Sequence, residues 1–165
     1  MTIVIMKFGG SCLVDEKAFL RILKITGDYA HSKNIYVASA LNGITDLLLG
    51  TAQNISNVKI LDKNMAIIEK RHFDIIEQIF EEGSDHYHKT KDFIDKRLSD
   101  LEDVFADIRE FGLEPYYQDY ILSFGEILST YILHQFLLSR EFDSVYIPAN
   151  KIIITNDEFN NAYPL

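Results

Sequence analysis

TIVIMKFGGS, residues 2–11, is the stretch of sequence that decides the fold. Residues 2–8 are mostly apolar, which is typical of a strand buried inside a parallel sheet. Gly9 and Gly10 interrupt this strand, and residues 15–32 then carry apolar side chains mostly at helical spacing. We therefore predict a strand that ends in a glycine turn and leads into a helix.

The same order follows once more along the chain. A second apolar strand, IYVA at residues 35–38, is interrupted at Asn42-Gly43, and a helical pattern continues through Leu47 and Leu48. Two successive strand–turn–helix units predict an α/β fold with a mostly parallel sheet.

The middle of the chain, from about residue 61 to residue 139, has no convincing strand. Three amphipathic helices are predicted there, over residues 61–81, 90–109 and 117–139, and the third begins at Pro115 if proline occupies its first turn. We expect a helical insertion that covers one side or end of the sheet. Strand character returns at residues 144–147 and 152–155, and the last ten residues have the character of a connector.

Composition excludes several classes of function. The chain has 165 residues, enough for one domain or one lobe, and a net charge of -9 without a lysine or arginine cluster, which argues against nucleic acid and anionic membrane surfaces. Cys12 is the only cysteine, so no disulfide forms within the chain, in keeping with a cytoplasmic location. We find no signal peptide and no run of about 18 apolar residues, and expect no membrane span.

Lys7, Gly9, Gly10 and Ser11 form the first candidate site segment. Glycines let backbone amides approach a bound oxyanion, and a lysine at a strand end supplies positive charge for phosphate. The carboxyl ends of parallel strands are also where α/β folds bind ligands. The alternative interpretation is a tight turn with a surface lysine.

Two further segments offer polar groups for a small ligand. Ser39 and Thr45 flank the second turn, where hydroxyl and amide donors suit a carboxylate; alternatively, Thr45 only caps the helix. Gly125 costs a helix about 1 kcal/mol against alanine, so close packing or a nearby ligand should compensate. Glu126 beside it is suited to a substrate ammonium group, or is simply a solvated glutamate.

These segments, together with TNDEF at residues 155–159, Ala162 and Pro164, resemble the aspartokinases of the amino-acid kinase family. KFGGS resembles the opening signature of that family, SA followed by GITD its second loop, and FGEILS its third segment. Arg71-His72 is similar to a pair common in the family, and we interpret His72 as a structural histidine that makes a local hydrogen bond. The resemblance covers essentially the whole chain.

The resemblance implies a three-layer α/β/α sandwich in which residues 1–165 form the N-terminal, amino-acid-binding lobe, without the nucleotide lobe and ACT domains. It implies transfer of the γ-phosphoryl group of Mg-ATP to the side-chain carboxylate of L-aspartate, on the route to lysine, threonine and methionine. ATP and Mg²⁺ would be used by the complete enzyme, which is expected to be a homo-oligomer. None of the carried-over residues is expected to bind a metal.

Roles carry over by position. Lys7 would stabilise charge on the transferring phosphoryl group, and Gly9, Gly10 and Ser11 would place donors beside the phosphates. Thr45 would contact aspartate, Ser39 would line the site, and Glu126 would pair with the ammonium group of aspartate.

Two departures from the family pattern matter. The downstream Gly-Arg-Gly-Gly segment, whose arginine holds the substrate α-carboxylate, is missing, and residues 147–150 read IPAN where an aspartate is usual. We therefore expect little or no turnover from this chain alone. A non-catalytic truncated paralogue, which binds an amino acid or a kinase subunit, is an alternative, as is a glutamate or carbamate kinase.

Overall fold

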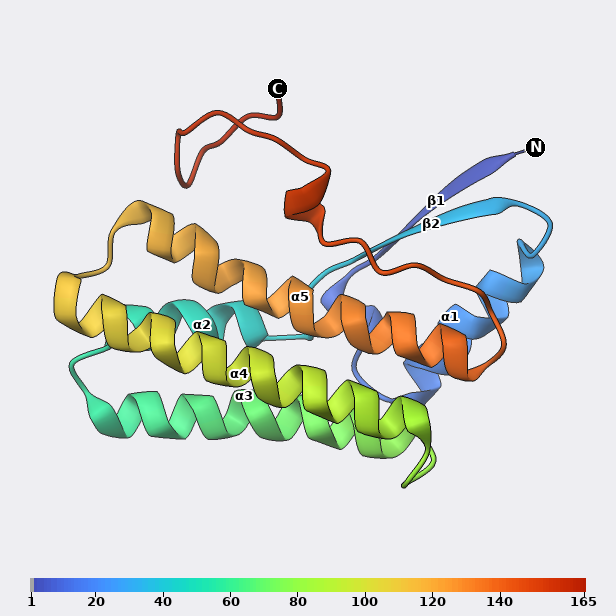
Figure 1. The fold of residues 1–165 in the computed structure, drawn as a ribbon, viewed down its shortest axis with the longest axis horizontal. Coiled ribbons are helices and arrows are strands. Elements are labelled where there is room, and N and C mark those ends of the chain that lie inside the picture. Colours follow the sequence, from blue (N-terminus) through green and yellow to red (C-terminus); the bar gives the residue numbers. More distant parts are fainter. Residues whose placement is uncertain (1) are drawn as a thin grey trace.

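The chain contains a two-stranded parallel sheet at the position predicted from its first residues. β1 (Ile3–Phe8) pairs with β2 (Lys33–Ala38), from Ile3 opposite Lys33 to Phe8 opposite Ala38. Parallel strands need a long crossover connection, and α1 (Glu16–Asp28) supplies it (Figure 1). The computed structural model describes residues 2–165.

The remaining elements are four α-helices and two short 3-10 turns. In chain order these are η1 (Gly10–Cys12), α2 (Ile44–Gln53), α3 (Val58–Ile79), α4 (Asp85–Phe111), α5 (Pro115–Ser139) and η2 (Ala149–Lys151). The helical block predicted over residues 61–139 is therefore confirmed as α3, α4 and α5, which run side by side along the molecule (Figure 1).

Local chemistry sets where the long helices begin. The Ser84 hydroxyl accepts a hydrogen bond from the Tyr87 N–H at 3.2 Å and caps α4. Pro115 occupies the first turn of α5, as predicted, where its missing N–H costs nothing. These two starts divide the helical block into α3, α4 and α5.

Helices cover one face of the sheet, and the core lies between the sheet and these helices. Met6, Phe8 and Ala38 point into this core, and the rings of Phe19 on α1 and Phe136 on α5 meet edge-to-face at 5.3 Å. The opposite face exposes four β-branched side chains: Ile3, Ile5, Ile35 and Val37. The predicted α/β fold with a parallel sheet is thus confirmed, with one sheet face open in the described residues.

The two strands predicted near the C-terminus are absent from the described residues, so this prediction was wrong. Residues 144–147 are extended but unpaired, and residues 152–155 contribute only a single antiparallel bridge, between Thr155 and Pro164. A strand needs a neighbouring segment to complete its hydrogen bonds, and an apolar pattern does not supply one. Residues 144–147 have no such neighbour in the described part of the chain, and the neighbour of residues 152–155 is only the end of the tail around Pro164.

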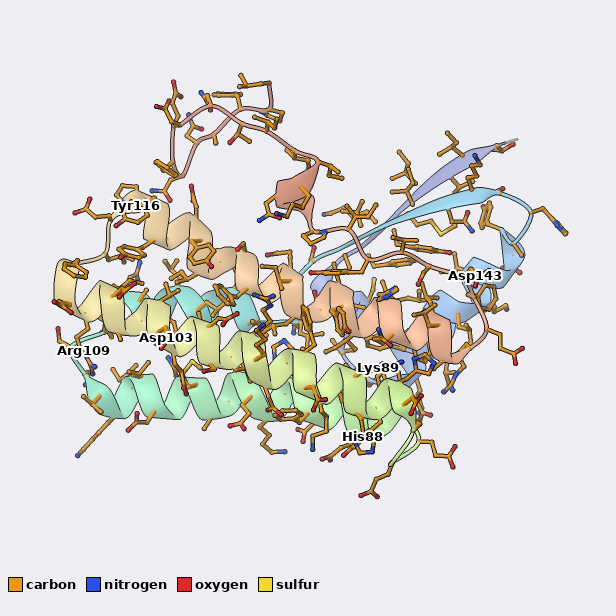
Figure 2. All side chains as sticks on the ribbon, viewed as in Figure 1. His88, Lys89, Asp103, Arg109, Tyr116 and Asp143 are labelled. Atoms are coloured by element: carbon orange, nitrogen blue, oxygen red, sulfur yellow. The ribbon has the colours of Figure 1, made fainter. Side chains whose placement is uncertain are left out.

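The C-terminal tail runs back toward the start of α5, where Figure 2 shows Tyr116 beneath it. The rings of Tyr116 and Phe159 meet edge-to-face at 6.1 Å, and the Asn160 N–H donates to an Asp119 carboxylate oxygen at 2.8 Å. The tail is otherwise exposed, as expected of a connector.

α5 is long and apolar enough, by length and composition alone, to cross a membrane. However, 56% of its most apolar window is buried inside the protein, where it packs against α4, α2 and the sheet. Its composition is therefore that of a central core helix.

Candidate functional site

The loops that follow β1 and β2 lie against each other at the carboxyl end of the sheet. A Cβ atom on Gly10 would be 2.8 Å from the Ala40 carbonyl oxygen and 3.3 Å from Asn42 Cα, so only glycine fits there. The Ser39 N–H donates to the Phe8 carbonyl oxygen at 2.9 Å and continues the strand pairing into the loops. The first two predicted segments therefore form one surface.

The first loop presents free backbone donors. Within residues 2–165, the N–H groups of Gly9, Gly10 and Ser11 make no hydrogen bond, whereas the next two N–H groups, of Cys12 and Leu13, close the turn onto the carbonyls of Gly9 and Gly10. Consecutive unpaired N–H groups at a turn are a binding surface for an oxyanion. The phosphate role of this segment stays a prediction.

Lys7 lies one residue before the end of β1, and its side chain is exposed on the open face of the sheet. Its ammonium group makes no ion pair or hydrogen bond within the described residues. The structure therefore places Lys7 at the carboxyl end of the sheet and does not join its side chain to the other candidate residues.

The second loop presents the start of α2. Gly43 is the N-cap residue, in the left-handed conformation with φ +74°, and no side chain caps the helix. Thr45 is the second residue of α2, and its side chain is exposed. The alternative that Thr45 caps the helix was therefore wrong. The N–H groups of Thr45 and Asp46 make no hydrogen bond in the described part of the chain, and with the Thr45 hydroxyl they suit a carboxylate.

α5 packs directly on the second loop through three residues of its predicted segment: Gly125, Glu126 and Ser129. Glu126 Oε1 accepts from the Ala40 N–H at 3.3 Å, and the buried Ser129 hydroxyl donates to the Ser39 carbonyl at 2.7 Å. A Cβ atom on Gly125 would be 2.6 Å from the Ala40 Cβ. Close packing therefore explains the glycine in this helix, and it places the Glu126 carboxylate at the second loop.

Two residues that hold this loop were not among the predicted site residues. Ser129 is one, although it lies within the FGEILS segment. Arg71 on α3 is the other, because its Nη1 donates to the Asn42 carbonyl at 2.9 Å. The Arg71-His72 pair signalled the position of Arg71, but only the fold reveals that α3 passes beside the loop.

His72 is fully buried inside α3 and its neighbours. Its Nδ1–H donates to the Ile68 carbonyl at 2.7 Å, and burial lowers the pKa of the imidazole to about 4. The ring is therefore neutral, and its interpretation as a structural histidine with a local hydrogen bond is confirmed.

No group of three or more His, Cys, Asp or Glu side chains within residues 2–165 is arranged to hold a metal ion. The candidate site residues form a surface of backbone amides, hydroxyls and one carboxylate, which suits a small zwitterionic or anionic ligand.

The chain matches known proteins over nearly its full length. The sequence pattern of the Amino acid kinase family matches residues 2–163. Lysine-sensitive aspartokinase 3 of Escherichia coli (strain K12) is 28% identical over 98% of this chain, and Aspartokinase 3, chloroplastic, of Arabidopsis thaliana is 26% identical over 96%. These matches cover 34% and 28% of the two relatives, so the chain spans about a third of their length.

A solved structure supports the same fold. The crystal structure of E. coli aspartokinase III in complex with aspartate and ADP superposes with a TM-score of 0.87 over 99% of this chain and 35% of that chain, at 24% sequence identity. Aspartate kinase of Clostridium acetobutylicum is also similar, with a TM-score of 0.59 over 84% of this chain and 28% identity.

Proposed function

Because this chain belongs to the amino acid kinase family, we propose that residues 1–165 are the amino-acid-binding lobe of an aspartokinase. The complete enzyme would transfer the γ-phosphoryl group of ATP to the side-chain carboxylate of L-aspartate. The single observation that carries this proposal is the contact of three segments, in which the loops after β1 and β2 meet each other and Glu126 on α5.

The geometry supports separate roles for the first loop and for the second loop with α5. The free N–H groups of Gly9, Gly10 and Ser11 would hold oxygen atoms of the transferring phosphoryl group, and Lys7 would neutralise its charge. A carboxylate oxygen of aspartate forms the new bond to phosphorus while the bond to the ADP oxygen breaks, so no proton has to move.

The second loop and α5 would bind the amino acid. Thr45 would donate to the substrate, the backbone around Ser39 would line the site, and Glu126 would attract the substrate ammonium group. Glu126 already accepts from the Ala40 N–H, so the substrate would share a carboxylate whose position is fixed. Phosphoryl transfer depends mainly on such positioning and on charge neutralisation.

ATP and Mg²⁺ belong to the proposal for the complete enzyme, where the metal would neutralise phosphate charge. Homo-oligomeric assembly, a cytoplasmic location and a role in lysine, threonine and methionine synthesis are proposed with it, on the basis of the family resemblance. The 165-residue chain by itself is proposed to lack turnover, because a site without its second lobe does not enclose the reacting groups.

Titration of the ¹⁵N-labelled chain with L-aspartate tests the binding proposal directly. Amide signals of Ala40, Thr45 and Glu126 should move in a saturable manner, and D-aspartate and L-glutamate at equal concentration should move them less. Equal responses to L-glutamate would favour a different amino-acid kinase, and no response to any amino acid would contradict the proposal.

Trapping with hydroxylamine tests turnover. An acyl phosphate reacts with hydroxylamine to a coloured hydroxamate, so the chain incubated with Mg-ATP and L-aspartate should give no more product than a blank without enzyme. A robust hydroxamate yield would contradict the proposal that this lobe is inactive alone.

A further inference from the structure

Arg71 lies on α3, outside every segment to which the proposed mechanism assigns a role, yet it contacts the substrate loop. We infer that Arg71 is a positioning residue: its guanidinium fixes the turn from which α2 begins, and therefore the direction of the Thr45 donors. This inference rests on the proposed function, because it concerns the same amino-acid site.

The first contact is with a carbonyl that has no other partner. Arg71 Nη1 donates to the Asn42 oxygen at 2.9 Å. No backbone N–H near this turn donates to that oxygen: Ile44 N–H donates to the Leu41 oxygen at 3.0 Å and Leu47 N–H to the Gly43 oxygen at 3.3 Å, and those of Thr45 and Asp46 make no hydrogen bond in the described residues. Within residues 2–165, Arg71 is therefore the one group that satisfies the Asn42 carbonyl.

The second contact is steric. Gly43 has φ +74°, and a Cβ atom placed on it would lie 3.0 Å from Arg71 Nη1. The guanidinium thus packs against the left-handed residue that caps α2, as well as bonding to the residue before it. If this turn shifts, the first turn of α2 rotates with it, and the Thr45 hydroxyl and N–H move away from the site.

The remaining charges on α3 leave Arg71 available for this role. Asp74, the acid that follows it on the helix, is held by Lys70 at 2.6 and 2.8 Å. No ion pair of Arg71 occurs in the part of the chain that the structure describes. The planar guanidinium can bond a carbonyl and pack against a backbone at the same time, which the ammonium group of lysine does less well.

The contact borders open solvent, which sets the size of the expected effect. Asn42, Arg71 and Gln78 line an open hollow of about 270 Å³. Water can therefore replace part of the bond to the Asn42 carbonyl when Arg71 is removed. Loss of the Arg71 guanidinium should therefore shift an equilibrium that depends on the turn, such as L-aspartate binding, by about five- to tenfold.

The test compares Arg71→Met with Lys63→Met in the 165-residue chain. Both variants remove one positive charge from α3, but only the first removes the contact with the turn, because Lys63 is exposed and makes no ion pair in the described residues. Arg71→Met should raise the hydrogen-exchange rate of the Ile44 amide and weaken L-aspartate binding, each about five- to tenfold. Lys63→Met should leave both unchanged, and Arg71→Lys should recover part of the loss.

The possible outcomes separate this inference from the proposed function. Arg71→Met and Lys63→Met with the same exchange rates and affinities would overturn the positioning role, while aspartate binding by the unmodified chain would still support the proposed function. A loss of affinity that merely accompanies global unfolding would also overturn it. If the unmodified chain does not bind aspartate, the proposed function fails, and the Ile44 exchange rate alone decides whether Arg71 holds the turn.

Discussion

Gly125 makes the packing of α5 on the substrate loop directly testable. Replacing this glycine with alanine adds a Cβ atom that would lie 2.6 Å from the Ala40 Cβ, well inside van der Waals contact. Neither atom is at the end of a flexible side chain, so the helix or the loop has to move. We expect Gly125→Ala to displace Ala40 and to lengthen the bond between its N–H and Glu126.

Two effects of opposite sign determine the size of the change in stability. Alanine should stabilise the helix by about 1 kcal/mol relative to glycine. Overpacking in a well-filled core costs about 1–3 kcal/mol. The variant should therefore be about as stable as the parent or less stable by up to about 2 kcal/mol.

Gly50→Ala is the matched control, because Gly50 lies inside α2 and a Cβ atom on it would meet nothing within 4 Å. Urea unfolding should show Gly50→Ala to be more stable than the parent by about 0.5–1 kcal/mol. The double variant Ala40→Gly/Gly125→Ala should recover stability, because it removes the atom that the new methyl group meets. Equal stabilisation by Gly125→Ala and Gly50→Ala would refute the packing argument.

Three other perturbations have definite expected outcomes. Burial lowers the pKa of His72 from 6.5 to about 4, so as the pH falls the imidazole takes up its proton in the unfolded chain before it does so in the folded chain. The free energy of unfolding should therefore fall by about 3 kcal/mol between pH 6.5 and pH 4, and urea titrations of His72→Gln should lack this part of the fall. Ser129→Ala leaves the Ser39 carbonyl without its buried donor and should lower the free energy of unfolding by about 1–2 kcal/mol in the same assay; an unchanged value would mean that water replaces the hydroxyl. The apolar open face of the sheet should drive concentration-dependent association of the chain, which light scattering in a dilution series would detect. The double variant Ile5→Lys/Ile35→Lys should abolish this association, and association that persists in the variant would place the contact elsewhere.

The elements that could be predicted from the sequence are those whose signal is local. β1 and β2 contain short apolar runs that end at turn residues, the long helices have apolar residues at a period of about 3.6, and caps such as Ser84 mark helix starts. The parallel arrangement followed from the order of strands and helices, because a helix between two strands makes a parallel pair the natural result.

The candidate site was only partly predictable, for a physical reason. Glycines and hydroxyls at strand ends indicate a loop that approaches something closely, but they do not say what it approaches. Gly10 contacts the backbone at Ala40 and Asn42, and Gly125 contacts Ala40, so both glycines serve the assembly of the site itself. Arg71 could not be assigned this way, since its role depends on where α3 passes in space.

The unpaired segment at residues 144–147 shows why strand prediction failed near the C-terminus. Tyr146 packs edge-to-face on Tyr131 at 5.3 Å, and Ser144 Oγ lies 2.7 Å from His134 Nδ1, so side chains hold the segment extended along α5. Val145 and Ile147, which point the other way, are 82% and 55% exposed. Half-buried and exposed side chains therefore alternate along residues 144–147 as they do in a strand, and this alternation accounts for the course of the backbone along α5. What the alternation does not supply is a neighbouring backbone, because hydrogen-bond pairing depends on a second segment whose position is set by the rest of the fold.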